Sequence, residues 1–190
     1  MGLEKIYVEY RQLQGYVGWS ADDEARVRSV APLVLESTEA LVRDFYEEIR
    51  RHPQTVSVIT GGERQVERLK ESLRGWIRDA FTGPYDESYV HRRWQIGKRH
   101  VDIGLLQIFV HAAFSRLRAG ILSAIGAGWR RDGSDLQLVI VSVEKLLDLD
   151  LALIQDAFET EYQARQRPLD EIGVRQQRVV AQISERALSG

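Results

Sequence analysis

The stretch "RRWQIGKRHVDIGLL", residues 92–106, carries one histidine on a helical segment with a glycine on each side of it. Arg93, Ile96, Gly97 and His100 share one helical face, because residues three or four positions apart are neighbours on a helix. A glycine one turn before a histidine removes the side chain that would keep a flat group away from the imidazole. Gly104 then permits a sharp turn, so that the next helix can pack beneath that group. This setting favours a ligand for the metal of a flat cofactor over an ordinary structural histidine.

Composition excludes several classes of protein. The 190-residue chain suits one domain, and its net charge of −2, with acids and bases interspersed, gives no electrostatic case for binding nucleic acid or a membrane surface. The absence of cysteine excludes disulfides, cysteine-ligated zinc, iron–sulfur clusters and thioether-attached haem. The N-terminus lacks the apolar core of a signal peptide, and charged residues interrupt the apolar C-terminal run. We therefore expect a cytoplasmic chain without a membrane span.

Helical periodicity extends through nearly the whole chain, and no two neighbouring segments have the pattern of a β-hairpin. Ser20 precedes three acidic residues and predicts a capped helix start, after a loose N-terminal arm. Residues 56–62 are too short and isolated for a sheet and are expected to form a connecting corner. The other predicted helices cover about residues 41–51, 62–82, the segment around His100, 105–125, and 134–166 before Pro168. The sequence predicts an all-α fold.

A binding site opposite His100 requires a second wall. Tyr46 lies at the edge of an apolar stripe, where its phenol can reach inward; an amphipathic tyrosine at the boundary of the core is the alternative. The helix between Tyr46 and His100 carries a leucine–serine–leucine pattern that suits a core as well as a cofactor wall. The stripe and the pattern comprise Val42, Phe45, Leu69, Ser72 and Leu73.

The order of these features resembles the sensor globin domain of the globin-coupled sensors, which are bacterial haem-based oxygen sensors. The resemblance rests on "LVRDFYEEIRRHP" (41–53), "ERLKESLRGWIRDAF" (67–81) and "YVHRRWQIGKRHVDIGL" (89–105), and it spans about residues 20–165. It implies a globin-like fold without a separate second domain. The implied organisation is an N-terminal extension over 1–19, a globin sensor domain over 20–166, and a linker helix over 167–190 towards an output module.

The resemblance also implies roles for individual residues. His100 corresponds to the proximal ligand of the iron of haem b, and Tyr46 to the residue that hydrogen-bonds bound O2. A phenol in an apolar pocket stabilises the partial charge on bound O2 by about 1 to 3 kcal/mol. CO and NO are further ligands of such an iron. The implied gas-binding positions include Leu69 and Ser72, and the implied cofactor-binding positions are Val42, Phe45, Leu73, Ile96 and Gly97.

The three remaining histidines are not expected to bind iron. His52 is interpreted as a residue at a helix end beside Pro53, His91 as exposed, and His111 as packed between helices. No histidine lies on the predicted helix 62–82, so coordination of the iron by two histidines is not supported.

The resemblance further implies a homodimer formed by the last two long helices, whose apolar content also suits the interior of one globin core. Beyond Pro168, a partial heptad pattern suits a signalling linker or a frayed tail; it comprises Leu169, Ile172, Val179, Ile183 and Ala187. A histidine kinase, diguanylate cyclase or chemotaxis transducer is the expected kind of output. The chain itself carries no kinase or cyclase motif and is not expected to be an enzyme.

Two other functions compete with a gas sensor. The first is a haem-free globin-like interaction module of a stress-signalling complex, which Gly97 and His100 opposite Tyr46 argue against. The second is a haem enzyme, such as an NO dioxygenase or a weak peroxidase. Such an enzyme usually requires a reductase partner or a distal acid–base group, and the sequence has no flavin or nicotinamide motif.

Overall fold

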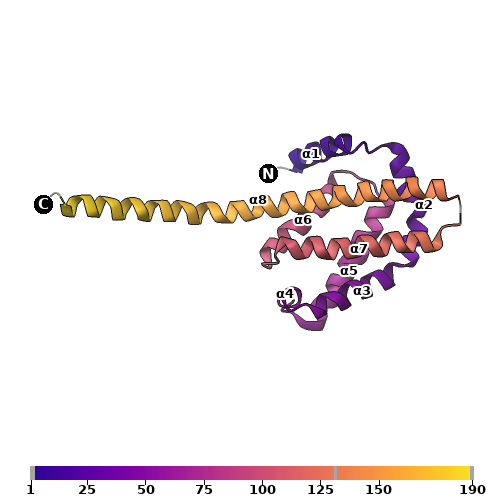
Figure 1. Ribbon diagram of the computed structural model, residues 1–190, viewed down its shortest axis with the longest axis horizontal. Coiled ribbons are helices and arrows are strands. Elements are labelled where there is room, and N and C mark those ends of the chain that lie inside the picture. Colours follow the sequence, from indigo (N-terminus) through magenta and orange to yellow (C-terminus); the bar gives the residue numbers. More distant parts are fainter. Residues whose placement is uncertain (1–2, 131, 189–190) are drawn as a thin grey trace.

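The computed structural model describes residues 3–130 and 132–188, with side chains for 4–130 and 132–166. Within these ranges the chain forms eight helices and no strand, which confirms the all-α fold (Figure 1). The helices are α1 (Leu3–Tyr16), α2 (Ala21–Glu36), α3 (Thr38–Arg51), α4 (Pro53–Val56), α5 (Gly62–Thr82), α6 (Glu87–Asp102), α7 (Gln107–Gly128) and α8 (Gly133–Leu188).

The N-terminal segment is a packed helix, so the expectation of a loose arm was wrong. Helix α1 buries Ile6, Tyr10 and Gln14 and contacts α6 and α8. These three residues are spaced four apart, so they form one stripe on the helix. An amphipathic stripe of this kind is stable only against another apolar surface, which α6 and α8 supply.

The start of α2 is fixed by its cap. The Ser20 hydroxyl accepts a hydrogen bond from the Asp23 N–H, and the Asp23 carboxylate accepts one from the Ser20 N–H. Asp23 is buried because α8 also binds it: Ser142 donates to Asp23 at 2.7 Å and Lys145 at 3.2 Å. One acidic residue therefore caps α2 and joins it to α8.

The connection between α3 and α5 agrees with the prediction of a corner. His52 ends α3 with an extended backbone, and Pro53 begins the four-residue helix α4. Gly62, whose φ of +61° favours glycine, begins α5.

Helix α7 is the apolar helix expected near residues 105–125, and it extends to Gly128. Among the described helices it alone has the length and composition to cross a membrane. In this fold it packs against α2, α3 and α8 and buries the face that carries Val110, Phe114, Leu117, Ile121 and Ile125. It is thus a core helix whose opposite face stays exposed.

Helix α8 is longer than the sequence predicted. It was expected to end near residue 166, but it passes through Pro168 and extends beyond the body of the molecule (Figure 1). A proline inside a helix removes one backbone hydrogen bond, and the neighbouring Gln166, Arg167 and Leu169 add little further cost because their helix propensity is high. The side chains of the predicted heptad pattern lie outside the described part of the chain.

Candidate functional site

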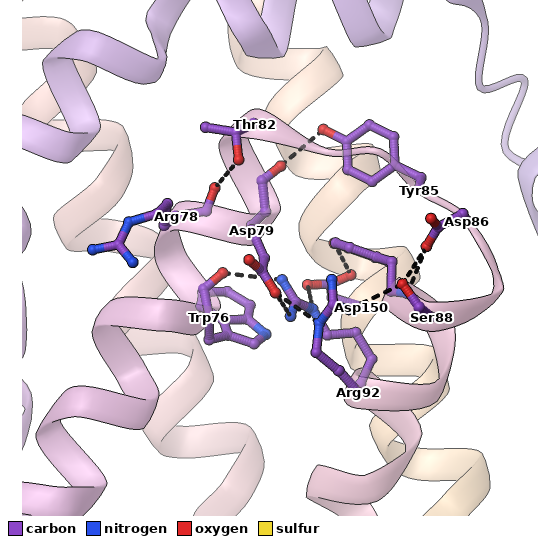
Figure 2. Close-up of polar contacts among 12 residues, drawn as sticks. Trp76, Arg78, Asp79, Thr82, Tyr85, Asp86, Ser88, Arg92 and Asp150 are labelled. Atoms are coloured by element: carbon purple, nitrogen blue, oxygen red, sulfur yellow. Dashed lines mark hydrogen bonds and ion pairs between the residues drawn. The ribbon is translucent and has the colours of Figure 1, made fainter.

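Helices α5 and α6 are joined at one end by a short turn, and a buried ion pair joins α6 to α8 there. The Arg93 guanidinium donates to the Asp150 carboxylate of α8 at 2.9 Å and to the Trp76 carbonyl of α5 at 3.0 Å. The Tyr89 hydroxyl donates to the other Asp150 oxygen at 2.6 Å. Figure 2 shows Asp150 between Trp76 and Asp79 on one side and the start of α6 on the other. This cluster connects α5, α6 and α8 at the closed end of the α5–α6 hairpin.

The predicted site residues lie farther out along the same two helices. His100 follows Arg93 by seven residues on α6, and Leu69 precedes Trp76 by seven residues on α5. Seven residues make about two helical turns, or roughly 10 Å. His100 and Leu69 are therefore equally distant from the Trp76–Arg93 contact, one on each helix.

His100 is half-buried, and its Nδ1 atom is fully buried without a hydrogen-bond partner among the described residues. Burial lowers the pKa of His100 from 6.5 to about 4, because the charged imidazolium loses its hydration. The side chain is therefore a neutral imidazole at neutral pH, which is the form that binds metals. A neutral, partly buried imidazole that no protein group holds at Nδ1 is in the form that would bind a haem iron.

Gly97 does not have the surroundings that the sequence suggested. A Cβ atom at this position would lie 2.0 Å from the Ile154 carbonyl oxygen and 2.8 Å from the Ala157 Cβ, both on α8. Gly97 therefore permits the backbones of α6 and α8 to touch, and α6–α8 is the largest helix contact of the described chain. The expectation that its missing side chain makes room for a flat cofactor was wrong, because an adjoining helix fills that space.

Tyr46 is buried on α3, with 7% of its surface exposed. Burial raises the pKa of its phenol well above 10, so the hydroxyl keeps its proton and remains a donor. None of the described residues forms a hydrogen bond with this hydroxyl. Tyr46 also lines a small pocket between α3 and α5, together with the charged side chains of Arg43, Glu47, Arg50 and Lys70.

The apolar residues predicted around the cofactor are partly exposed. Four of them pack against the core without being fully buried: Phe45 on α3, Leu69 and Leu73 on α5, and Ile96 on α6. Val42, in contrast, is 1% exposed. Incomplete burial of these side chains on α3, α5 and α6 leaves apolar surface for a bound group to cover.

Ser72 lies on the solvent side of α5. It is exposed, and its hydroxyl donates to the Arg68 carbonyl of its own helix at 3.0 Å.

The other three histidines differ in position from His100. His52 ends α3 and bonds to Glu48 at 2.9 Å, which agrees with its prediction. His91 is half-buried rather than exposed, and its Nδ1 is also without a partner in the described chain. His111 is exposed on α7 and contacts Gln155 of α8, so it links these two helices at the surface of the molecule.

Sequence reasoning missed the buried cluster of Arg93, Asp150 and Tyr89. Charged residues on helices usually lie in solvent, so the two charged members gave no reason to expect burial. The one available signal is the interruption of an apolar run by Asp150, which was interpreted only as evidence against a membrane span. Trp76 lies on the apolar side of the predicted helix 62–82 and is indeed buried, with 7% of its surface exposed, but its place beside this cluster was not predicted.

Comparison with known proteins agrees with this arrangement. The sequence matches the Protoglobin family over residues 7–164. It is 28% identical over 185 residues to the heme-based aerotactic transducer HemAT of Halobacterium salinarum, and the match covers 93% of this chain. The chain spans only 37% of the length of that transducer.

Solved structures show the same fold. The globin domain of the Geobacter sulfurreducens globin-coupled sensor has a TM-score of 0.73 at 26% identity, covering 78% of this chain and 96% of that domain. The ferrous globin domain of E. coli DosC has a TM-score of 0.62 at 17% identity, covering 76% of this chain and 96% of that domain. These similarities confirm the globin-like fold and the resemblance to sensor globins.

Proposed function

The chain belongs to the protoglobin family, and from that premise we propose that it is a haem b-binding globin domain that senses O2. His100 is the proximal ligand in this proposal. The observation that carries it is the buried, neutral imidazole of His100, whose Nδ1 has no partner in the described chain. Haem bound in this way supplies an iron position that is open to O2, CO or NO.

The chain's own residues provide the surroundings of the gas. Tyr46 keeps its phenolic proton and is free to donate a hydrogen bond to bound O2. Phe45, Leu69, Leu73 and Ile96 offer apolar surface to the porphyrin faces, and Val42 supports them from the core. The Ser72 hydroxyl donates a hydrogen bond to the Arg68 carbonyl. Ser72 contributes to the site only if this bond breaks and the hydroxyl donates to the bound gas instead. Gly97 contributes indirectly, by holding α6 against α8.

Signalling in this proposal proceeds through α8. The helix carries the contacts to α6 and continues past residue 166, so a change at His100 reaches the C-terminal end of the chain. We propose a homodimer through α7 and α8, in a cytoplasmic protein whose output is a kinase, a cyclase or a chemotaxis transducer. The chain itself acts as a sensor and not as an enzyme.

A haem-free interaction module is the second candidate function. In the sequence, Gly97 argues against this function. The contact of Gly97 with α8 explains the glycine without any cofactor, so Gly97 no longer counts against a haem-free module.

The absorption spectrum of the purified protein after haem reconstitution distinguishes these functions. We expect a strong Soret band that is lost in His100→Ala but retained in Tyr46→Phe and in the control His111→Ala. In Tyr46→Phe, O2 should dissociate about tenfold faster or more, since a hydrogen bond to a charged group contributes roughly 1.5 to 3 kcal/mol. Colourless protein, or an equal Soret band in His100→Ala, would reject the haem sensor and favour the interaction module.

A further inference from the structure

The indole N–H of Trp76 is a buried donor without an acceptor. Trp76 is 7% exposed, and its Nε1 atom is fully buried with no hydrogen-bond partner in the described chain. Buried polar groups are nearly always hydrogen-bonded, so an exception requires an explanation. Leaving such a donor unsatisfied costs free energy, which makes it a strong donor to any acceptor that enters.

The remainder of the Trp76 side chain is held firmly. Its ring packs edge-on against Phe114 of α7 at 5.8 Å between centroids, and the Arg93 guanidinium lies 5.3 Å from the ring centroid. Its backbone carbonyl accepts from Arg93. Because these contacts fix the ring, the unpartnered N–H has a defined direction.

That direction is towards α6. Figure 2 shows the indole nitrogen on the side of the ring that is turned to α6. Trp76 also shares one face of α5 with Leu73 and Leu69, three and seven residues before it. This is the face that the proposed function assigns to the cofactor side of α5.

We infer that the Trp76 N–H is a second hydrogen-bond donor to the gas bound at the site, alongside Tyr46. The inference rests on the proposed haem-binding function. It assigns Trp76 to ligand selectivity: two donors favour O2, which carries partial negative charge, over CO, which carries little.

Trp94 supplies a matched control for this inference. It is also a tryptophan with 7% of its surface exposed, but its Nε1 donates to the Asp156 carboxylate at 3.3 Å. Replacing Trp94 with phenylalanine therefore removes an N–H that already has a protein partner, whereas the same change at Trp76 removes one that has none.

The experiment compares Trp76→Phe and Trp94→Phe in the reconstituted holoprotein. We expect O2 to dissociate roughly three to ten times faster in Trp76→Phe, the effect of one neutral hydrogen bond. The C–O stretching frequency of the CO complex should rise, because a donor near the gas lowers it. Trp94→Phe should leave both values at those of the unchanged protein.

Stability of the haem-free protein separates a ligand role from a structural one. Trp76→Phe breaks no protein hydrogen bond, but it removes part of a buried ring that packs on Phe114 and Arg93. Its urea midpoint should therefore fall about as much as that of Trp94→Phe, in which O2 dissociation does not change. A normal Soret band with unchanged O2 dissociation and C–O frequency in Trp76→Phe would overturn the inference while leaving the proposed function intact. Loss of the Soret band in the unchanged protein, by contrast, would reject the proposed function itself.

Discussion

His100 illustrates how burial prepares a single residue for metal binding. The half-buried ring has no charged partner, so the loss of hydration alone lowers its pKa to about 4. A ligand that is already neutral releases no proton when a metal binds near neutral pH. Burial of His100 has a cost in the haem-free protein: at acidic pH the imidazole binds a proton more readily in the unfolded chain, so acid favours unfolding.

The free energy of unfolding of the haem-free protein should therefore depend on His100 between pH 7 and pH 5. In this window the unfolded chain, with a pKa near 6.5, binds a proton that the folded chain, with a pKa of about 4, does not bind. His100 thus makes the folded state less stable as the pH falls, by at most about 2 kcal/mol at pH 5. Urea titrations of His100→Phe should show a correspondingly weaker loss of stability on acidification.

His111→Gln is the control, because this exposed histidine lies at the rim of α7 and α8. Its stability curve should follow that of the unchanged protein. An identical pH dependence in His100→Phe and in the unchanged protein would mean that the His100 imidazole is hydrated in the folded chain.

At the scale of the elements, the crossing of α6 over α8 connects the proposed gas site to the helix that leaves the domain. Two features hold the crossing: the buried Arg93–Asp150 ion pair and the backbone contact at Gly97. Burying the two charges costs free energy of hydration, which their mutual attraction and hydrogen bonds must offset. The ion pair is therefore better evidence that α6 and α8 have one fixed alignment than that the fold is highly stable.

Gly97→Ala tests this crossing. The new methyl group would lie 2.0 Å from the Ile154 carbonyl oxygen, so the two helices must move apart. We expect the free energy of unfolding to fall by about 1 to 3 kcal/mol, the usual effect of overpacking. Gly75→Ala on α5 is the control: nothing lies within 4 Å of its new Cβ, and alanine should stabilise that helix by up to about 1 kcal/mol. Equal stability of Gly97→Ala and the unchanged protein in urea would contradict the close approach of α6 and α8.

Local patterns predicted the elements better than they predicted the contacts between them. Ser20, the turn at Gly104 and the apolar stripe around Tyr46 act within a few residues, and the predicted helices agree with the structure there. The partner of Gly97 lies 57 residues away at Ile154, and no short-range pattern contains it. The sequence predicted that the last helix ends before Pro168, because a proline is unfavourable inside a helix. Helix formation is cooperative, so a long helix can continue through one unfavourable residue.

At the scale of the whole molecule, apolar side chains remain exposed on the two longest helices. Ile108 on α7 is 69% exposed, and Leu138 and Val141 on α8 are 50% and 40% exposed. Leu138 and Val141 lie three residues apart and share one face of α8. Exposed apolar side chains on one helical face, as at Leu138 and Val141, favour a binding partner, which in the proposed function is a second copy of the chain.

Val141→Glu should weaken this dimer. A carboxylate in a paired apolar interface loses its hydration without gaining a partner, so we expect the dissociation constant to rise at least tenfold. Sedimentation equilibrium over a range of protein concentrations measures that change. Val8→Glu is the control, because Val8 is 50% exposed, compared with 40% for Val141, and lies on α1, away from the proposed interface. Because the substituted side chain is exposed in the monomer, the Soret band of Val141→Glu should stay intact. A raised dissociation constant in Val8→Glu, or an unchanged one in Val141→Glu, would mean that the two copies contact each other through a different face of the molecule.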